Sequence, residues 1–379
     1  MRIALIIKDY SLKKGGLERY VVNLSNELLN MGHEVHVIAN YWDKPVSPEI
    51  IFHKVPIIKF SFFFKNISFV RNTRKLLNKD FFDIISGFSR IYPLDAYRIG
   101  HKVRQHLLKV QYPSKFERFL KYISIRHLTI LYLEKQIFKK DNFRKIIANS
   151  NLGKSHAILY YKVPEDKIEV IYNGVDLKKF NPQVKIRYRD AFRKKLGLSE
   201  DDILILFVGR NFRLKGVKNI IQSLPLIRGE KDKIHVLIVG KGKPSSFLRL
   251  AGKLGVKDRI VFEGESHQIE KFYAAGDIFV LPTLYDPFAN VCLEAFACGI
   301  PVITTRMNGA AEIIEQGKNG FVIGESAPAD ELAQKITQLL SRKLREKMGR
   351  HAFETAKKYT LTQNAEKVEK LYQEIVANR

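Results

Sequence analysis

The first forty residues alternate between short apolar runs and one amphipathic segment. Residues 3–7 are an apolar run typical of a buried strand, and residues 8–16 are a polar loop that ends in two glycines. Apolar residues then recur at helical spacing over 17–29, Gly32 ends this segment, and residues 35–39 are a second apolar run. The pattern predicts a strand, a loop, a helix and another strand.

The same order of segments returns about 200 residues later. Residues 203–207 are an apolar run, 209–216 a basic loop, 217–227 a helix-like segment, and 234–239 an apolar run that ends at Gly240. Continuous apolar runs indicate strands that are buried on both faces, as in parallel sheets. We therefore expect two doubly wound α/β domains, with ligands bound at the carboxyl ends of their strands.

The turn-forming residues 173–176 mark the expected domain boundary. Beyond them, apolar runs at 260–262, 278–281 and 301–304 alternate with helix-like segments, and the last forty residues read as two charged amphipathic helices. The second domain should therefore repeat the architecture of the first.

Length and composition place the chain among ordinary globular proteins. It has 379 residues, 45% hydrophobic and 27% charged, which excludes a disordered or fibrous chain and suggests two domains. Its two cysteines, Cys292 and Cys298, exclude a disulfide framework and are expected to be buried thiols in a reducing compartment. No apolar run has the length of a membrane span, and the N-terminal run is too short for a signal peptide, so we expect a cytoplasmic protein.

The net charge of +26 points to an anionic partner. Segment 51–150 carries 21 Lys and Arg but 6 Asp and Glu, so it holds more than half of the excess charge, and aromatic residues are interleaved with it, as at 60–65. This combination is typical of a surface that binds a membrane or a nucleic acid. The alternative is a basic solvated face over an ordinary core.

The strongest chemical signal lies at residues 286–302. Asp286 follows an apolar run, and the helix predicted after it should present the N–H groups of Ala289, Asn290 and Val291 to an anion. Glu294, in the same helix, can accept hydrogen bonds from two sugar hydroxyls. Taken alone, the same residues also fit an N-capping Asp and a surface Glu.

These residues resemble the donor-binding motif of glycosyltransferase family 4, a family of retaining enzymes with the GT-B fold. The motif is a carboxylate, seven residues, Glu, then Ala, Gly and Pro, here Asp286, Glu294, Ala295, Gly299 and Pro301. Further family features stand in the expected order over nearly the whole chain: Gly15, Gly16, Gly209, Arg210, Lys215, Gly216, Gly240 and Phe262.

The resemblance implies two facing Rossmann-like domains with a cleft between them. Residues 1–172 would bind the acceptor, with the C-terminal helix 356–379 crossing back onto this domain, and residues 173–355 would bind the nucleotide-sugar donor. The implied donor-binding residues are Gly15, Gly16, Gly240, Phe262, Ala289, Asn290, Val291 and Glu294.

Within the family, the chain is most similar to the lipopolysaccharide core glucosyltransferase I group. The similarity rests on residues 87–90, 94–97 and 258–259, and it implies transfer of glucose from UDP-glucose to an inner-core heptose. One departure concerns the donor sugar: the family usually has Glu where this chain has Asp286. Because the side chain of Asp is shorter and this residue contacts the sugar in relatives, the resemblance does not fix which sugar is transferred.

The implied mechanism is metal-independent and needs no cofactor. Arg210 and Lys215 would hold the diphosphate leaving group, Arg as a fork and Lys as a point charge, while the glycine loop 15–16 adds backbone donors. By resemblance, Asp95 would bind or deprotonate the acceptor hydroxyl. The alternatives are a helix N-cap for Asp95 and a solvated loop residue for Lys215. His101 and His106 are expected at the surface.

The resemblance, together with the basic segment, therefore implies a retaining hexosyltransferase at the inner face of the cytoplasmic membrane. Its partners would be a UDP-sugar, a lipopolysaccharide-core or related glycolipid, and the anionic membrane surface through segment 51–150, with no nucleic acid. Alternatives are a GT-B transferase of another glycolipid or of exopolysaccharide, a nucleotide-sugar epimerase, and a nucleic-acid-binding protein, which would leave the motif at 286–302 unexplained.

Overall fold

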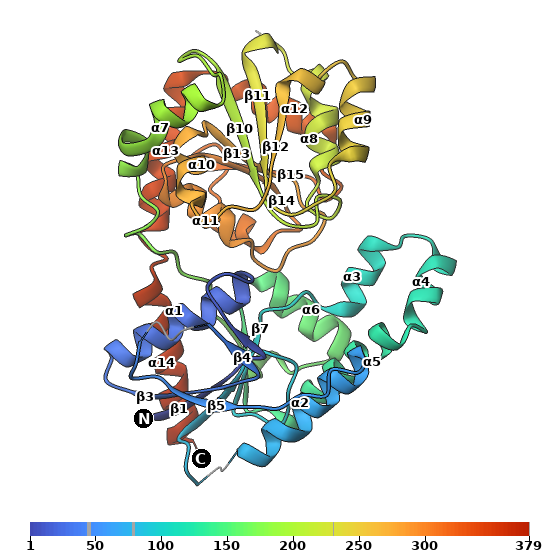
Figure 1. Ribbon diagram of the computed structural model, residues 1–379, viewed down its shortest axis with the longest axis vertical. Helices are drawn as coiled ribbons and strands as arrows, with labels where there is room; N and C mark the ends of the chain where they lie inside the picture. The colour runs from blue at the N-terminus through green and yellow to red at the C-terminus, as the bar shows by residue number, and fades with distance from the viewer. Residues whose placement is uncertain (44–46, 78–79, 230, 379) are drawn as a thin grey trace. The chain divides into compact units, whose positions relative to one another are not determined.

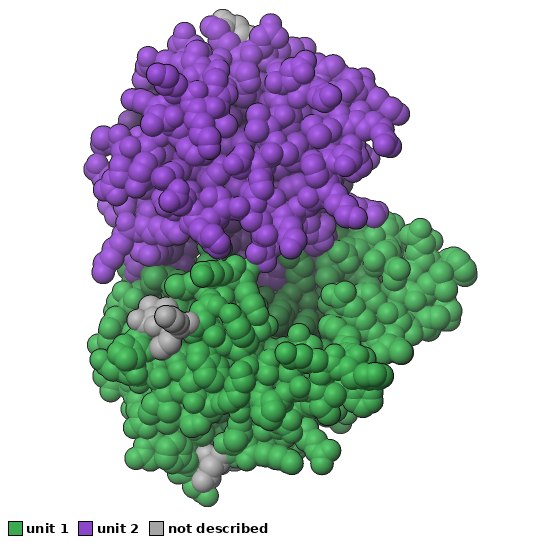
Figure 2. Space-filling view, in the orientation of Figure 1, with its two compact units in different colours: residues 1–173, 361–379 green, residues 174–360 purple. Residues whose placement is uncertain are grey.

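In the computed structural model, which describes residues 1–43, 47–77, 80–229 and 231–378, the chain divides into two units. The first unit is Met1–Asn173 with Leu361–Arg379, and the second is Gly174–Thr360 (Figures 1 and 2). Each unit is a parallel sheet flanked by helices, which confirms the predicted pair of Rossmann-like domains.

Among its described residues, the first unit forms a seven-stranded parallel sheet in the order β5-β3-β1-β6-β7-β8-β9. The strands are β1 (Arg2–Ile6), β3 (Glu34–Ala39), β5 (Ile51–Lys54), β6 (Ile84–Gly87), β7 (Ala96–Ile99), β8 (Lys145–Ala148) and β9 (Ile168–Val170). A small separate ladder pairs β2 (Asp9–Tyr10) with β4 (Tyr41–Trp42).

The helices of this unit are α1 (Gly16–Asn30), α2 (Phe62–Leu76), α3 (Arg104–Gln111), α4 (Lys115–Tyr122), α5 (Ile125–Ile137), α6 (Asn151–Tyr161) and α14 (Leu361–Ala377), with short 3₁₀ turns at Lys140–Asn142 and Glu165–Lys167. Helices α1 and α14 lie side by side (Figure 1). The helix expected over 356–379 begins later, at Leu361, because α13 continues to Ala356 and Thr360 pairs with Val175; as expected, it belongs to the first unit.

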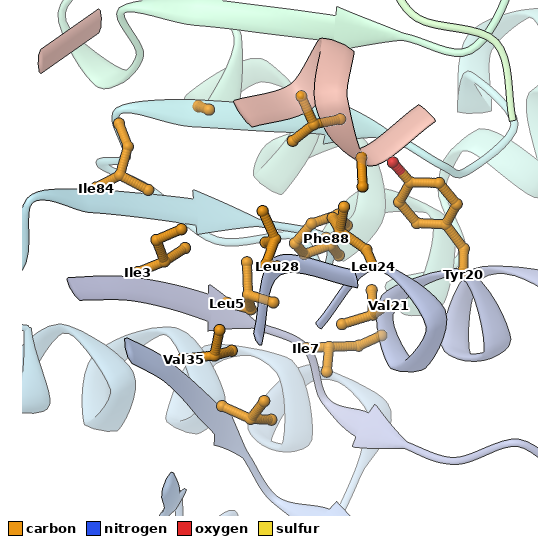
Figure 3. Close-up of a cluster of buried hydrophobic side chains, with 14 of the residues drawn as sticks. Ile3, Leu5, Ile7, Tyr20, Val21, Leu24, Leu28, Val35, Ile84 and Phe88 are labelled. Atoms are coloured by element: carbon orange, nitrogen blue, oxygen red, sulfur yellow. The ribbon is translucent and has the colours of Figure 1, made fainter. Parts of the chain in front are cut away.

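Alternation along β1 explains the core of the first unit. Ile3, Leu5 and Ile7 enter the cluster under α1 and α14, whereas Ala4 and Ile6 enter a second cluster on the opposite face of the sheet. Figure 3 shows the first cluster. The run is apolar throughout because both of its faces are buried.

Within the described part of the second unit, six parallel strands follow the order β12-β11-β10-β13-β14-β15. They are β10 (Ile203–Val208), β11 (Ile234–Val239), β12 (Ile260–Glu263), β13 (Ile278–Leu281), β14 (Val302–Thr305) and β15 (Gly320–Ile323). The chain order reverses between β10 and β13, and such a reversal is where doubly wound sheets bind ligands.

The helices of the second unit are α7 (Gln183–Lys195), α8 (Val217–Ser223), α9 (Ser245–Lys253), α10 (Ile269–Ala275), α11 (Asn290–Ala297), α12 (Ala329–Gln338) and α13 (Arg342–Ala356). Short 3₁₀ turns lie at Leu224–Leu226, Lys231–Lys233, Lys257–Arg259 and Gly309–Ile313. The helix predicted over 217–227 ends at Ser223 because Pro225 cannot continue it. None of the described helices is long and apolar enough to cross a membrane.

Candidate active site

A buried ion pair joins the two loops at the reversal point of the second sheet. Lys215 lies in the loop between β10 and α8, and its Nζ donates a hydrogen bond to Oδ2 of Asp286, which follows β13. Both side chains are 11% exposed. Because desolvation offsets much of the attraction in a buried pair, such a pair is weak evidence for stability and a reason to look for function.

Backbone hydrogen bonds fix the position of Asp286. Its N–H donates to Met307 O at 2.8 Å, and its carbonyl accepts from Gly309 N at 2.9 Å, which ties the loop after β13 to the loop after β14. Its Oδ1 also accepts a hydrogen bond from Phe288 N at 3.2 Å. Because its side chain is 11% exposed and pairs with this carboxylate, Lys215 is not a solvated loop residue.

Glu294 is buried within α11 and is oriented by a tyrosine from the preceding helix. Tyr273 in α10 donates its hydroxyl hydrogen to Oε2 of Glu294 at 2.9 Å. Burial and then this carboxylate raise the pKa of Tyr273 well above its usual value, so the phenol stays a donor. The alternative of a surface Glu is wrong, and the two carboxylates of the motif both lie inside the second unit.

The N-terminus of α11 differs from the sequence prediction. Ala289 is the N-cap, and its N–H, expected to be available to an anion, instead donates to Oδ1 of Asn308 at 3.1 Å. Asn308 is fully buried and also donates from Nδ2 to Thr304 Oγ1 at 2.9 Å. Asn290 and Val291 begin the helix, as predicted.

Two glycines allow the loops of the second unit to approach each other closely. Gly240 has φ +128°, and a Cβ there would lie 2.1 Å from Gly209 O. Gly216 has φ +80°, and a Cβ would lie 2.0 Å from Pro282 O. Both positions therefore exclude other residues for backbone reasons alone.

Arg210 follows β10, and Phe262 lies in β12. The guanidinium of Arg210 is half exposed and pairs with the carboxylate of Glu265 at 2.6 Å. Glu265 was not predicted from the sequence. The ring of Phe262 packs 5.7 Å from that of Phe212, beside a cavity of about 500 Å³. The cavity is lined by Asn211, Phe212, Arg213, Lys218, Gly242, Lys243, Ser246, Phe247 and Leu250.

The glycine loop belongs to the first unit, at the start of α1. Gly15 is the N-cap and Gly16 the first residue of the helix. The side chain of Glu18 folds over this turn, so that a Cβ on Gly15 would lie 2.5 Å from Glu18 Oε2. Approach of another group to this backbone therefore requires Glu18 to move.

The structure places Asp95 away from the expected position. Residues 88–95 connect β6 to the parallel β7, and Asp95 immediately precedes β7, level with Ile85 in the middle of β6. Four residues separate it from the carboxyl end of β7, about 13 Å at the usual rise. Its carboxylate accepts from Ile85 N at 2.9 Å and pairs with Arg144 at 3.3 Å. Asp95 is thus part of the sheet and not an N-cap or a residue of a carboxyl-edge loop.

His101 and His106, which were expected at the surface, are both half-buried. His101 is half-buried, and burial followed by nearby cations, Arg90 first, lowers its pKa well below the usual value. His106 stacks on His156 with ring centroids 4.0 Å apart. Cations from two other loops act on His101, and aromatic side chains of α6 contact His106, which their sequence spacing did not indicate.

Both cysteines are free and buried in or beside α11, as predicted. Burial raises the pKa of Cys292 to about 12, so its thiol is neutral at physiological pH. Over the described residues, no three His, Cys, Asp or Glu side chains form a group that could hold a metal ion. The metal independence of the reaction stays a prediction.

Comparison with known proteins agrees with this architecture. Residues 14–179 match the model described as Glycosyltransferase Family 4, and residues 188–355 match the one described as Glycosyl transferases group 1. The lipopolysaccharide glucosyltransferase WaaG of Escherichia coli is 26% identical over 362 residues, covering 93% of this chain and 94% of that protein. A glycosyltransferase of Methanocaldococcus jannaschii is 28% identical over 352 residues, covering 90% of this chain and 89% of that protein.

Solved structures share the fold over almost the full length. A crystal structure of WaaG superposes with a TM-score of 0.82 at 23% identity, covering 98% of this chain and 99% of that chain. HepE of Anabaena, solved in complex with UDP-glucose, gives a TM-score of 0.74 at 17% identity, covering 99% and 100%. With both halves matched, the chain belongs to the glycosyltransferases of the GT-B type, in the family 4 and group 1 lineage that includes WaaG-like enzymes.

Proposed function

We propose that this protein is a retaining hexosyltransferase that moves a sugar, glucose in the first instance, from a UDP-sugar to a lipopolysaccharide inner-core heptose. The observation that carries the proposal is the buried pair of Lys215 and Asp286, with Glu294 nearby in α11, at the reversal point of a Rossmann-like sheet. The full-length similarity to WaaG, a lipopolysaccharide glucosyltransferase, supports this choice of donor and acceptor.

The chemistry follows from the charge that develops at the anomeric bond. When this bond breaks, the sugar ring becomes positive and a nucleoside diphosphate leaves with extra negative charge. Lys215 would stabilise that charge as a point cation, and the exposed guanidinium of Arg210 would bind the phosphates as a fork once it releases Glu265. These cations supply the charge that a metal supplies in other transferases, so we propose a metal-independent reaction.

Glu294 would select the sugar by accepting hydrogen bonds from its hydroxyls. Its carboxylate is buried and already oriented by Tyr273, so little conformational entropy remains to be lost when the sugar binds. Asp286, in place of the family's usual Glu, would set which hydroxyl can be reached.

A second candidate is a GT-B transferase that uses another UDP-sugar to build a different glycolipid or exopolysaccharide. Two observations favour it: the shorter side chain of Asp286, and the diversity of similar proteins. One of these, N-acetyl-alpha-D-glucosaminyl L-malate synthase of Bacillus anthracis, is 24% identical over 358 residues. An epimerase would turn over the donor without any acceptor, so product analysis separates it from both transferases.

The first experiment measures thermal stability with UDP, ADP, GDP and their glucose, galactose and N-acetylglucosamine conjugates. A ligand present at one hundred times its dissociation constant adds about 2.7 kcal/mol of stability. We expect stabilisation by UDP-glucose that is reduced in Glu294→Gln and retained in Glu270→Gln, a matched change in neighbouring α10. A folded protein that no nucleotide sugar stabilises would contradict the proposal.

The second experiment determines the anomeric configuration of the product by NMR, with dephosphorylated and intact lipopolysaccharide core fragments as acceptors. Retention of configuration and activity in the presence of a metal chelator are expected. A product with inverted anomeric configuration would contradict the proposed retaining mechanism, and loss of activity with the chelator would contradict the proposed metal independence.

We also propose that the first unit binds the anionic surface of the membrane. Helix α4 has no buried residue, and large apolar side chains on α4 and α5 are exposed, among them Phe116 at 71% and Phe119 at 60%. Basic residues alternate with them: Lys115, Arg118, Lys121 and Arg126. The guanidinium of Arg126 lies 5.3 Å from the ring of Phe62, which continues the surface onto α2.

Such a surface fits the boundary between lipid headgroups and acyl chains. The aromatic and aliphatic side chains would enter the interface, and each nearby Lys or Arg would add about 1 kcal/mol on an anionic membrane. In vesicle sedimentation, we expect binding that needs phosphatidylglycerol, weakens at high salt and is lost in Phe116→Ser/Phe119→Ser. The control Ile186→Ser, an exposed apolar residue of α7, should bind normally. Equal binding to neutral vesicles at high salt would refute the electrostatic part.

A further inference from the structure

Three cationic side chains follow neighbouring strands of the first unit's sheet. Strands β1, β6 and β7 are adjacent, and Lys8, Arg90 and Arg104 each come shortly after one of them, Arg104 being the first residue of α3. Because the strands are parallel, these residues lie on the carboxyl side of the sheet, where such folds bind ligands. The N–H of Lys8 donates to Ser89 Oγ at 2.8 Å, which joins the first two loops.

The ammonium group of Lys8 is held in one place. Its Nζ donates to Oδ1 of Asn66 in α2 at 2.6 Å and lies 5.2 Å from the centre of the Phe69 ring. Burial, followed by the charges of Lys65 and Arg90, lowers the pKa of Lys8 to about 8. It is therefore still mainly charged at neutral pH, although it is in an environment that disfavours the charge.

Arg90 and Arg104 share one buried carboxylate. Glu134 in α5 accepts from Nε and Nη2 of Arg90 at 3.1 and 3.0 Å and from the backbone N–H of Arg104 at 3.0 Å. Its Oε2 also accepts from the Tyr161 hydroxyl at 2.6 Å. The guanidinium Nε of Arg104 is buried and finds no hydrogen-bond partner among the described residues.

His101 lies among the same cations. The charges that act on it, in order, are those of Arg90, Lys8, Arg104 and Lys102, and with burial they keep its imidazole neutral. We call Lys8, Arg90 and Arg104 the cationic cluster. Glu134 contacts Arg90 and Arg104, while Lys65 and Asp9 also act on Lys8, so four cations face two carboxylates and the excess is two positive charges. A charge left uncompensated in a half-buried site is costly, so the cluster is suited to an anion.

We propose that the cationic cluster binds a phosphate monoester carried by the acceptor. This inference rests on the proposed function, in which the first unit holds the acceptor. A phosphate monoester brings a charge of about −1.5 to −2 at neutral pH, which matches the excess of the cluster, and its three oxygens can accept from Lys8 Nζ and Arg104 Nε. A neutral sugar would leave that charge uncompensated. The cluster would therefore select acceptors that carry a phosphate near the reacting hydroxyl.

The test is calorimetric titration of glucose 6-phosphate, and of glucose, into the full chain saturated with UDP, which occupies the phosphate-binding groups of the second unit. We expect the phosphate ester to bind much more tightly than glucose, and Arg104→Gln to weaken it at least about tenfold, since hydrogen bonds to charged groups contribute roughly 1.5–3 kcal/mol. Arg71→Gln, an exposed arginine of α2, is the matched control and should bind as the unchanged chain does.

Lys8→Met is the second variant, and it keeps the test decisive where Arg104→Gln does not fold. If UDP itself fails to bind, the proposed function fails, and the phosphate titration is then run on the chain carrying Arg210→Ala/Lys215→Ala.

The same titration with dihexanoyl phosphatidic acid tells the two sources of phosphate apart. Binding of either ester that depends on Arg104 or Lys8 supports the cluster and names its source, sugar or lipid. Affinities that neither variant changes, or equal binding of glucose and its phosphate, would overturn it.

Discussion

Replacing Lys215 by Met should separate the structural from the catalytic effect of the buried pair. The change leaves the carboxylate of Asp286, 11% exposed, without its cation. Breaking a buried pair from one side costs about 3–5 kcal/mol. Because Asp286 keeps the hydrogen bond from Phe288 N, we expect the low end, about 3 kcal/mol of unfolding free energy for the second unit.

The double variant Lys215→Met/Asp286→Asn removes the stranded charge. Asn has nearly the same shape and can still accept from Phe288 N, so the stability should return to within about 1.5 kcal/mol of the unchanged chain. Activity should not return, because the cation that stabilises the leaving diphosphate is missing from both variants. A loss of one such group costs roughly 100- to 1,000-fold in turnover.

The assay is urea unfolding followed by circular dichroism, with hydrogen exchange of the β10 and β13 amides to assign the loss to the second unit. Transfer kinetics are measured on the same preparations. A single variant as stable as the unchanged chain would refute the burial argument, and a double variant that recovers activity would refute the catalytic role of Lys215.

Three further predictions follow from buried polar groups. The carboxylate of Asp277 accepts hydrogen bonds from two arginines of α7 and from Leu204 N. Burial alone would raise the pKa of Asp277, but these partners lower it. Its contribution to the stability of the second unit is therefore present above about pH 4 and is lost as the pH falls through the folded-state pKa. Asp277→Asn should therefore destabilise the second unit by about 3 kcal/mol in urea unfolding, whereas the control Glu315→Gln, at an exposed carboxylate, should unfold as the unchanged chain does. Burial lowers the pKa of both His106 and His156 to about 4. Between about pH 6.5 and 4 the unfolded chain therefore binds more protons than the folded chain. As the pH is lowered through this range, the melting temperature of the first unit should fall, and it should fall less in His106→Phe. Tyr273→Phe should lower kcat about tenfold by releasing Glu294, and it should lower the unfolding free energy of the second unit by roughly 1.5–3 kcal/mol because a buried carboxylate loses its donor; a kcat equal to that of the unchanged chain would exclude this positioning role.

The fold was predictable because its signal is local. The apolar runs at 3–7 and 203–207 are strands buried on both faces, and in each case a loop and a helix follow at once. Two predicted helix ends were wrong for different reasons: Pro225, a local signal within the predicted segment, ended α8, whereas pairing of Thr360 with the distant Val175 delayed the start of α14 to Leu361.

Residues of the candidate site could be predicted where a family motif carries them, as for Asp286, Glu294 and Lys215, but the partners that orient them could not. Asp286 and Glu294 lie eight positions apart, so their relation can be read from a motif. Lys215 pairs with Asp286 across 71 positions, and Asn308, Tyr273 and Glu265 reach their partners from other loops and helices. None of these three stands in a recognisable spacing.

Sequence alone determined the two parallel-sheet domains and the segment that carries the donor motif, because strand burial, helix periodicity and glycine turns depend on neighbours a few residues away. Tertiary structure alone decided which charges meet. It placed Asp95 within the sheet beside Ile85, because residues 88–95 return the chain to the level of the middle of β6 before β7 begins. It also gathered Lys8, Arg90 and Arg104 at one edge, because parallel strands bring their carboxyl ends together whatever their separation along the chain.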